Sequence, residues 1–126
     1  MEKKTNLTES EWKVMEKLWE SAPMTITQLV NAVKDETGWA KATVITMLNR
    51  MEAKGAVYYN AGEKARLYYP AVARNEVAAQ ETEHFIDRVY NGSVGLLINS
   101  LVDNKQFSKA EIDELYAILK KAEEEL

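Results

Sequence analysis

The chain places three amphipathic helical patterns directly before a β-hairpin pattern, and this order limits its fold more than any other feature. The third helical pattern runs from Trp39 to Gly55. Its apolar residues recur at the i, i+3, i+4 and i+7 positions of an amphipathic helix: Val44, Met47, Leu48 and Met51. Two β-prone runs follow at residues 56–59 and 66–69, and the glycine-containing segment between them favours a hairpin turn. Pro70 ends the second run, because proline has no N–H to donate to a continuing ladder.

Two shorter helices are predicted before this segment, and each begins with a capping box. Thr8 pairs with Glu11 in the first box, and Thr25 pairs with Gln28 in the second. Pro23 separates the two helices, since proline cannot continue a helical hydrogen-bond ladder. The apolar faces are formed by Trp12, Val14, Met15, Leu18 and Trp19, and by Ile26, Leu29, Val30 and Val33. We expect the two tryptophans to anchor the core.

Three helices and a hairpin within about 70 residues are typical of a winged helix-turn-helix domain. The alternative is a small α+β domain with an unrelated hairpin. We therefore expect a mainly α fold with two domains. Residues 1–72 would form the winged helix-turn-helix with its three helices and hairpin wing. Residues 73–126 would form a C-terminal three-helix region, reached through a linker at residues 71–75.

The exposed face of the third helix carries the residue types that read DNA. Hydroxyl, amide and guanidinium groups can all contact base edges or phosphates in the major groove. Residues 39–70 also hold five basic side chains against two acidic ones, although the whole chain has a net charge of −4. The predicted DNA-binding residues are Lys41, Thr43, Thr46, Asn49, Arg50, Lys64 and Arg66. The alternative reading of this helix face is an ordinary solvated surface.

The C-terminal region is acidic, and its pattern predicts helices over about 76–90, 93–102 and from 108 onward. A third capping box, Ser108 with Glu111, begins the last helix. Three helices in about 55 residues bury too little surface to be stable alone, so we expect a homodimer. The alternative is that this region folds back on the winged helix. The predicted dimerisation residues are Phe85, Ile86, Val89, Leu97, Ile98, Leu101, Ile112, Leu115 and Leu119.

Composition excludes several kinds of site and several classes of protein. The chain has no cysteine, which excludes disulfides and thiolate metal sites and fits a reducing compartment. Residues 1–12 carry positive charge without an apolar segment, so we expect no signal peptide. No apolar run is long enough to span a membrane, and we expect a cytoplasmic protein without membrane insertion. His84 is the only histidine and has no visible catalytic partner. We predict no enzymatic activity, no cofactor and no metal.

Four segments together resemble the penicillinase repressor family, the BlaI, MecI and CopY-like proteins. Residues 8–15 resemble the family's opening helix, and Trp39 to Gly55 resembles its recognition helix. Residues 66–70 resemble the wing strand, and residues 85–92 the start of the dimerisation region. The resemblance implies a homodimeric repressor that binds palindromic double-stranded operators and blocks transcription.

The resemblance covers nearly the whole chain, with departures inside the recognition helix. Thr43, Thr46 and Arg50 match the family pattern. Relatives often carry other, more polar residues at four positions, which leaves the operator sequence open: Ala40, Lys41, Ala42 and Ile45. Copper-responsive members end in paired Cys-x-Cys motifs, which this chain lacks. The BlaI and MecI branch is therefore the better match.

The resemblance also implies a route for release of the operator. Some members are inactivated when a membrane-bound sensor protease cuts the dimerisation region at an Asn–Phe bond. The corresponding stretch here, residues 96–102, keeps an asparagine but has no Asn–Phe pair. The possible cleavage region is Asn99, Ser100 and Leu101. Two other functions stay open: a winged-helix protein-interaction module, and a small-molecule-responsive regulator with a pocket lined by Phe85, Tyr90 and Phe107.

Overall fold

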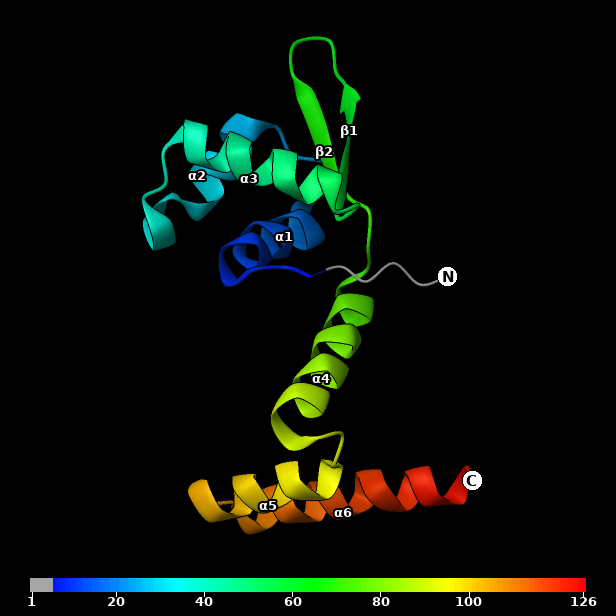
Figure 1. The fold of residues 1–126 in the computed structure, drawn as a ribbon. Coiled ribbons are helices and arrows are strands. Elements are labelled where there is room, and N and C mark those ends of the chain that lie inside the picture. The colour runs from blue at the N-terminus through cyan, green and yellow to red at the C-terminus, as the bar shows by residue number, and fades with distance from the viewer. Residues whose placement is uncertain (1–5) are drawn as a thin grey trace. The chain divides into compact units, whose positions relative to one another are not determined.

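The computed structural model describes residues 6–126, and that part contains six helices and a two-stranded sheet (Figure 1). The helices are α1 (Glu9–Ser21), α2 (Ile26–Thr37), α3 (Lys41–Ala53), α4 (Arg74–Tyr90), α5 (Val94–Asn104) and α6 (Lys109–Glu124). The strands are β1 (Val57–Ala61) and β2 (Arg66–Pro70), which form the hairpin. Residues 1–5, which are part of the segment predicted to lack a signal peptide, lie outside the described residues.

All three predicted capping boxes are present, and they set where α1, α2 and α6 begin. At α1, the Glu11 N–H donates to Thr8 Oγ1 at 3.1 Å, and the Thr8 N–H donates to Glu11 Oε1 at 2.9 Å. Thr25 caps α2 and Ser108 caps α6 in the same way. Each box satisfies N–H groups that have no partner inside the helix, so these three starts agree with the prediction.

Other helix ends differ from the predicted ones. Helix α3 begins at Lys41 rather than at Trp39, because Ala40 has extended backbone angles and caps the helix without a side-chain hydrogen bond. Helix α4 begins at Arg74, which shortens the expected linker of residues 71–75 to residues 71–73. Helix α5 continues to Asn104, about two residues beyond its predicted end. Apolar periodicity defines the middle of a helix better than its ends.

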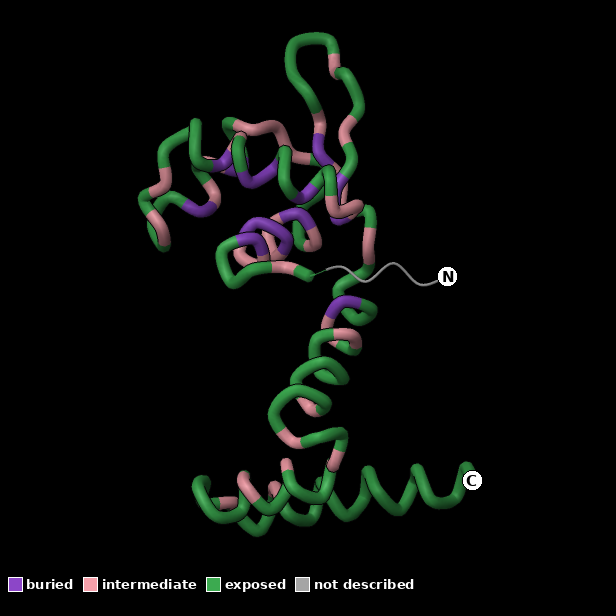
Figure 2. Tube along the Cα trace, in the orientation of Figure 1, coloured by how far each residue is buried: buried purple, intermediate pink, exposed green. Residues whose placement is uncertain are grey.

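The hydrophobic core lies among α1, α2, α3 and the hairpin (Figure 2). Its buried residues are Val14, Met15, Leu18, Leu29, Val44, Met47, Leu48, Met51, Ala56, Val57 and Tyr68. The predicted apolar stripe of α3 is therefore confirmed. The expectation for the tryptophans is only partly met, because Trp12 and Trp19 are half-buried at the core edge. Their rings meet edge to face at 5.3 Å, and Trp19 Nε1 donates to the Val72 carbonyl at 2.9 Å.

The hairpin is attached to the helices through the segment before α2. Strands β1 and β2 pair antiparallel, with Tyr58 opposite Tyr69 and Tyr59 opposite Tyr68. On the other edge of β2, Tyr68 N–H donates to the Met24 carbonyl at 2.8 Å, and Met24 N–H donates to the Tyr68 carbonyl at 3.1 Å. This short bridge joins the hairpin to the start of α2. The domain is the predicted winged helix-turn-helix.

The chain divides into two compact units, Met1–Glu83 and His84–Leu126. In the first unit, the start of α4 contributes a buried Val77, and Arg74 lies 3.7 Å from Glu16. In the second unit, α5 and α6 contain no buried residue. Within the described part of the chain, no helix is long and apolar enough to cross a membrane.

Candidate nucleic-acid interface

The exposed face of α3 presents a polar strip. At about 100° per residue, Thr43, Thr46 and Arg50 fall within an arc of about 60°, with Asn49 beside them. All four residues are exposed, whereas the stripe on the opposite side is buried in the core. A strip of this kind on one rigid helix can enter a major groove, which admits an α-helix.

The side chains of this strip differ in how many of their hydrogen-bond donors and acceptors are unused. Thr46 Oγ1 donates to the Ala42 carbonyl at 3.0 Å, so its proton is used inside the helix. Its oxygen can still accept a hydrogen bond, and its methyl group remains available for an apolar contact. Among the described residues, the side chains of Asn49 and Arg50 make no hydrogen bond or ion pair. These two side chains can therefore donate fully to a ligand.

The start of α3 adds groups that suit a phosphate. Ala40 provides no side-chain cap, so N–H groups of the first turn lack a side-chain acceptor. The exposed Lys41 is the first residue of the helix. N–H groups and a cation at a helix N-terminus both favour an anion, and this end of α3 can follow a DNA backbone.

The wing carries the other two predicted basic residues. Lys64 lies exposed in the hairpin turn, and Arg66 begins β2. The Gly62 N–H donates to the Ala65 carbonyl at 2.9 Å, and a Cβ at Gly62 would collide with that same carbonyl oxygen. The turn therefore requires glycine. A side-chain hydrogen bond with Tyr68 raises the pKa of Arg66, which stays cationic.

An ion pair between the half-buried Lys54 and the buried Glu11 joins α3 to α1, and local sequence patterns did not indicate it. Lys54 caps the end of α3, and its Nζ donates to Glu11 Oε1 at 2.6 Å and to the Asn6 carbonyl at 2.7 Å. Only 1% of Glu11 is exposed. Burial raises the pKa of Glu11, but hydrogen bonds from Lys54 and Thr8 outweigh it and leave the pKa below its usual value. Sequence patterns indicate only the capping role of Glu11 at the start of α1.

The predicted dimerisation residues all lie on unburied surface of the single chain. Ile86 and Leu97 are half-buried, and the other seven are exposed. Thirteen of the fourteen exposed large apolar side chains in the described region lie in residues 85–126. Surfaces this apolar mark interaction sites in proteins. Asn99, Ser100 and Leu101 lie inside α5, where the Asn104 side chain donates to the Ser100 carbonyl at 2.8 Å.

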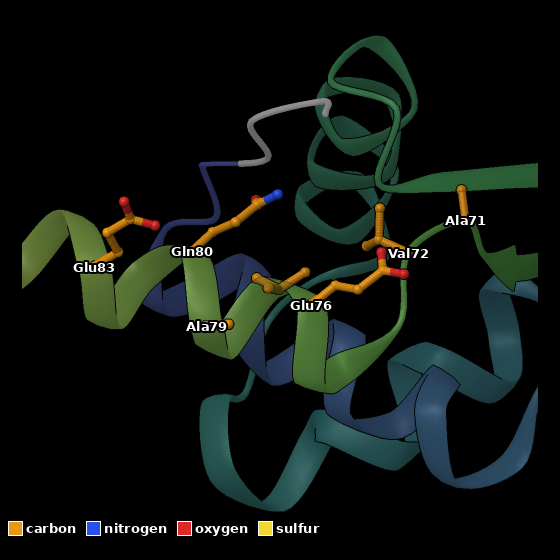
Figure 3. Close-up of a pocket in the computed structure, with 7 residues that line it drawn as sticks. Ala71, Val72, Glu76, Ala79, Gln80 and Glu83 are labelled. Carbon is orange, nitrogen blue, oxygen red and sulfur yellow. The ribbon is translucent and has the colours of Figure 1, made fainter. Parts of the chain in front are cut away.

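A hollow of about 570 Å³ lies beside the first half of α4 (Figure 3). It is lined by Ala71, Val72, Glu76, Val77, Ala79, Gln80 and Glu83. The aromatic residues expected to line a small-molecule pocket are not among them. Phe85 and Tyr90 instead contact each other edge to face at 5.8 Å, and Phe107 packs near Lys105. The hollow beside α4 is thus a different site, and the aromatic pocket stays a prediction.

Sequence comparisons connect most of the chain with one group of bacterial regulators. A family model described as penicillinase repressor matches residues 7–121. A penicillinase repressor of Bacillus licheniformis is 27% identical over 119 residues, which cover 94% of this chain and 93% of that protein. The methicillin resistance regulatory protein MecI of Staphylococcus aureus is 27% identical over 122 residues, which cover 96% and 99%.

Solved structures agree on the fold. The DNA-binding domain of the repressor BlaI matches with a TM-score of 0.54 and 22% identity, over 60% of this chain and 93% of that one. The monomeric form of Bacillus licheniformis BlaI in complex with the blaP half-operator matches with a TM-score of 0.53, the same identity and the same coverage. At this identity the likeness concerns the fold alone. With a family model that spans most of its length, the chain belongs to the penicillinase repressor family.

Proposed function

We propose that the chain is a sequence-specific transcriptional repressor that binds double-stranded operator DNA as a homodimer. The observation that carries this proposal is the exposed strip of Thr43, Thr46 and Arg50 on α3, opposite a fully packed core stripe. The relatives named above are repressors and a resistance regulator, and one fold neighbour is a BlaI complex with a half-operator. Operator DNA as the partner implies action in the cytoplasm.

The proposed contacts fall into two classes. Thr43, Thr46 and Asn49 would touch base edges or phosphate in the major groove, and Arg50 would reach a base or a phosphate. Three cations would contact phosphates regardless of sequence: Lys41, Lys64 and Arg66. If Arg50 also meets a phosphate, four charges per protomer would give a salt slope of roughly −3 to −4 for each half-site.

The dimer would form through the second part of the chain. The exposed apolar residues of α5 and α6 support this, because a surface of that composition is stabilised by burial against a second copy. The functional boundary would lie after residue 72. Residues 1–72 would bind DNA, and residues 73–126 would form the dimer interface. The first turns of α4 would then connect the two, since Val77 is buried in the first compact unit.

Release could follow proteolysis in the dimerisation region. Asn99, Ser100 and Leu101 lie in α5, and two of these three residues are exposed. A membrane-bound sensor protease is the proposed partner for this step. The bond here is not Asn–Phe, so such a protease would have to accept another residue after Asn99.

A gel-shift titration of the full-length chain on its own upstream DNA tests the function. We expect operator binding that weakens steeply with salt. Arg50→Ala should reduce operator affinity about tenfold and reduce the slope by about one unit. Lys121→Ala on α6 also removes one positive charge, but outside the proposed DNA interface, and should leave operator affinity unchanged. No binding at low salt would contradict DNA binding and favour a protein-interaction module.

A further inference from the structure

The wing carries two tyrosine pairs on opposite faces of its hairpin. Tyr58 and Tyr69 stack at 5.1 Å with an interplanar angle of 7°. Tyr59 and Tyr68 meet at 5.5 Å with an angle of 47°. Residues directly opposite in an antiparallel pair share a face, and the next pair along lies on the other face. The first pair therefore forms the outer face, and the second pair the inner face with the buried Tyr68.

Arg66 lies on the inner face with Tyr59 and Tyr68. It pairs with Ala61, two register positions from the Tyr59–Tyr68 pair, so its side chain leaves the sheet on the same side. The guanidinium carbon lies 4.2 Å from the centroid of the Tyr59 ring. A hydrogen bond with Tyr68, the nearby Tyr59 and the carboxylate of Glu52 in α3 all raise the pKa of Arg66. Arg66 is thus an exposed cation that two tyrosines of the wing hold in place.

A guanidinium stacked on a ring keeps its N–H edge available. The flat face of the group contacts the aromatic ring, while its donors point outward in a fixed fork that matches a phosphate. A free arginine must lose many rotamers when it binds, and this cost reduces affinity. An arginine that is already held by a ring loses fewer rotamers. Tyr59 itself is half-buried against the core, so the platform is anchored.

We infer that Tyr59 is a positioning residue, which holds Arg66 in the orientation that contacts a DNA phosphate. This inference rests on the proposed function. Tyr59 acts through Arg66 and need not touch DNA. Among the described residues, no arginine stacks on the outer pair of Tyr58 and Tyr69, so we assign it no such role.

The test measures DNA binding by full-length variants in two backgrounds. Tyr59→Leu should weaken binding to specific and random DNA alike by about threefold to fivefold, the value of an exposed cation–π contact. Tyr59→Phe keeps the ring and should bind as the wild type does. Tyr58→Leu changes an aromatic residue on the outer face and is the matched control. In an Arg66→Ala background, Tyr59→Leu should have no further effect.

The salt slope and the free protein provide independent readouts. Tyr59→Leu should keep the wild-type slope, because the charge remains, whereas Arg66→Ala should reduce it by about one unit. In unliganded protein, NMR should show the Arg66 δ protons shifted by the Tyr59 ring current in the wild type and Tyr59→Phe, and unshifted in Tyr59→Leu. This comparison does not depend on DNA, and wild-type δ protons without the shift would overturn the inference.

The outcomes separate this inference from the proposed function. Equal losses from Tyr59→Leu in both backgrounds would overturn the inference, because Tyr59 would then act without Arg66. Wild-type affinity in Tyr59→Leu, or in Arg66→Ala, would overturn it as well. In each of these cases the wild-type chain still binds DNA, and the proposed function stands. A wild-type chain that binds no DNA would remove the proposed function and this inference together.

Discussion

Thr46 has only part of its hydrogen-bonding capacity left for DNA. Its hydroxyl proton is given to the Ala42 carbonyl, so the oxygen can accept a hydrogen bond but the residue cannot readily donate one. Its methyl group is exposed on the same strip as Arg50. A thymine methyl is a suitable partner for that group, and a base amino group is suitable for the oxygen.

Two substitutions at Thr46 distinguish these contacts. Thr46→Val keeps the methyl and removes the acceptor, whereas Thr46→Ser keeps the hydroxyl and removes the methyl. If the oxygen makes the contact, Thr46→Val should change the preference among operator sequences by about fivefold, the value of one modest contact. If the methyl group makes it, Thr46→Ser should show that change instead. Gel-shift competition between single-base operator variants measures this preference. Equal losses on specific and random DNA would instead assign Thr46 to a phosphate.

At the scale of helices, an ion pair joins the end of α3 to the first turn of α1. Lys54 ends α3 and holds both Glu11 and the Asn6 carbonyl. The second carboxylate oxygen of Glu11 is buried without a hydrogen-bond partner among the described residues. Loss of Lys54 would therefore leave a buried carboxylate with one fewer donor, which is costly in a site of low dielectric.

Lys54→Met should destabilise the fold by about 2–3 kcal/mol, since it leaves a buried carboxylate unpaired. Lys17→Met is the matched control, because Lys17 forms only a loose pair with Glu36 at 3.9 Å on the surface. That control should change stability by less than about 0.5 kcal/mol. Urea unfolding followed by circular dichroism measures both values. Similar midpoints for the two variants would contradict a structural role for the buried pair.

The same pair predicts how stability depends on pH. The folded-state pKa of Glu11 lies below its unfolded value, so its contribution is fully present above the unfolded pKa. That contribution is lost as the pH falls through the folded pKa. Glu11→Gln should therefore reduce the acid sensitivity of the unfolding midpoint relative to the wild type. An unchanged acid profile would show that Glu11 does not control this loss.

Local signals allowed much of this domain to be predicted. Capping boxes lie within four residues of sequence, and they gave the starts of α1, α2 and α6 correctly. Periodicity identified the buried stripe of α3, and thereby the exposed strip with Thr43, Thr46 and Arg50. Periodicity gives the direction in which a side chain points but not how deeply it is buried. It therefore did not predict that Trp12 and Trp19 are only half-buried.

Features that depend on distant pairing could not be predicted. Lys54 and Glu11 are 43 residues apart, and no local pattern joins them. The stacking of Arg66 on Tyr59 depends on the hairpin register, which is set by the type and length of the turn, and sequence patterns gave neither. Helix α3 begins later than its sequence indicates, because Ala40 is a helix former in extended conformation.

For the whole molecule, the proposal is that the second unit packs against a second copy of the chain. Helix α6 carries an apolar side formed by Ile112, Leu115 and Leu119, all exposed in the single chain. Leu119→Glu would place a charge in the proposed dimer interface and should shift the chain toward monomers. Ala117→Glu adds the same charge on the polar side of α6 and should leave the dimer intact. Sedimentation at micromolar concentration measures both, and a wild-type monomer would contradict the dimer proposal.

A cut within α5 should release the operator, because it divides the proposed dimer region. Leu97, Ile98 and Leu101 lie on that helix, and their burial between subunits would be worth about 25 cal/mol per Å² of apolar area. A protease recognition site inserted between Asn99 and Ser100 allows the cut to be made in full-length protein.

The uncut variant is the reference for the cut, and cleavage should lower its operator affinity at least about tenfold. The loss is expected because a monomer gives up the second half-site, whose effective concentration the dimer had raised. The same recognition site added after Leu126 is the control, since a cut there removes nothing from α5 or α6. Undiminished gel-shift binding after the Asn99–Ser100 cut would exclude cleavage in this region as a release step.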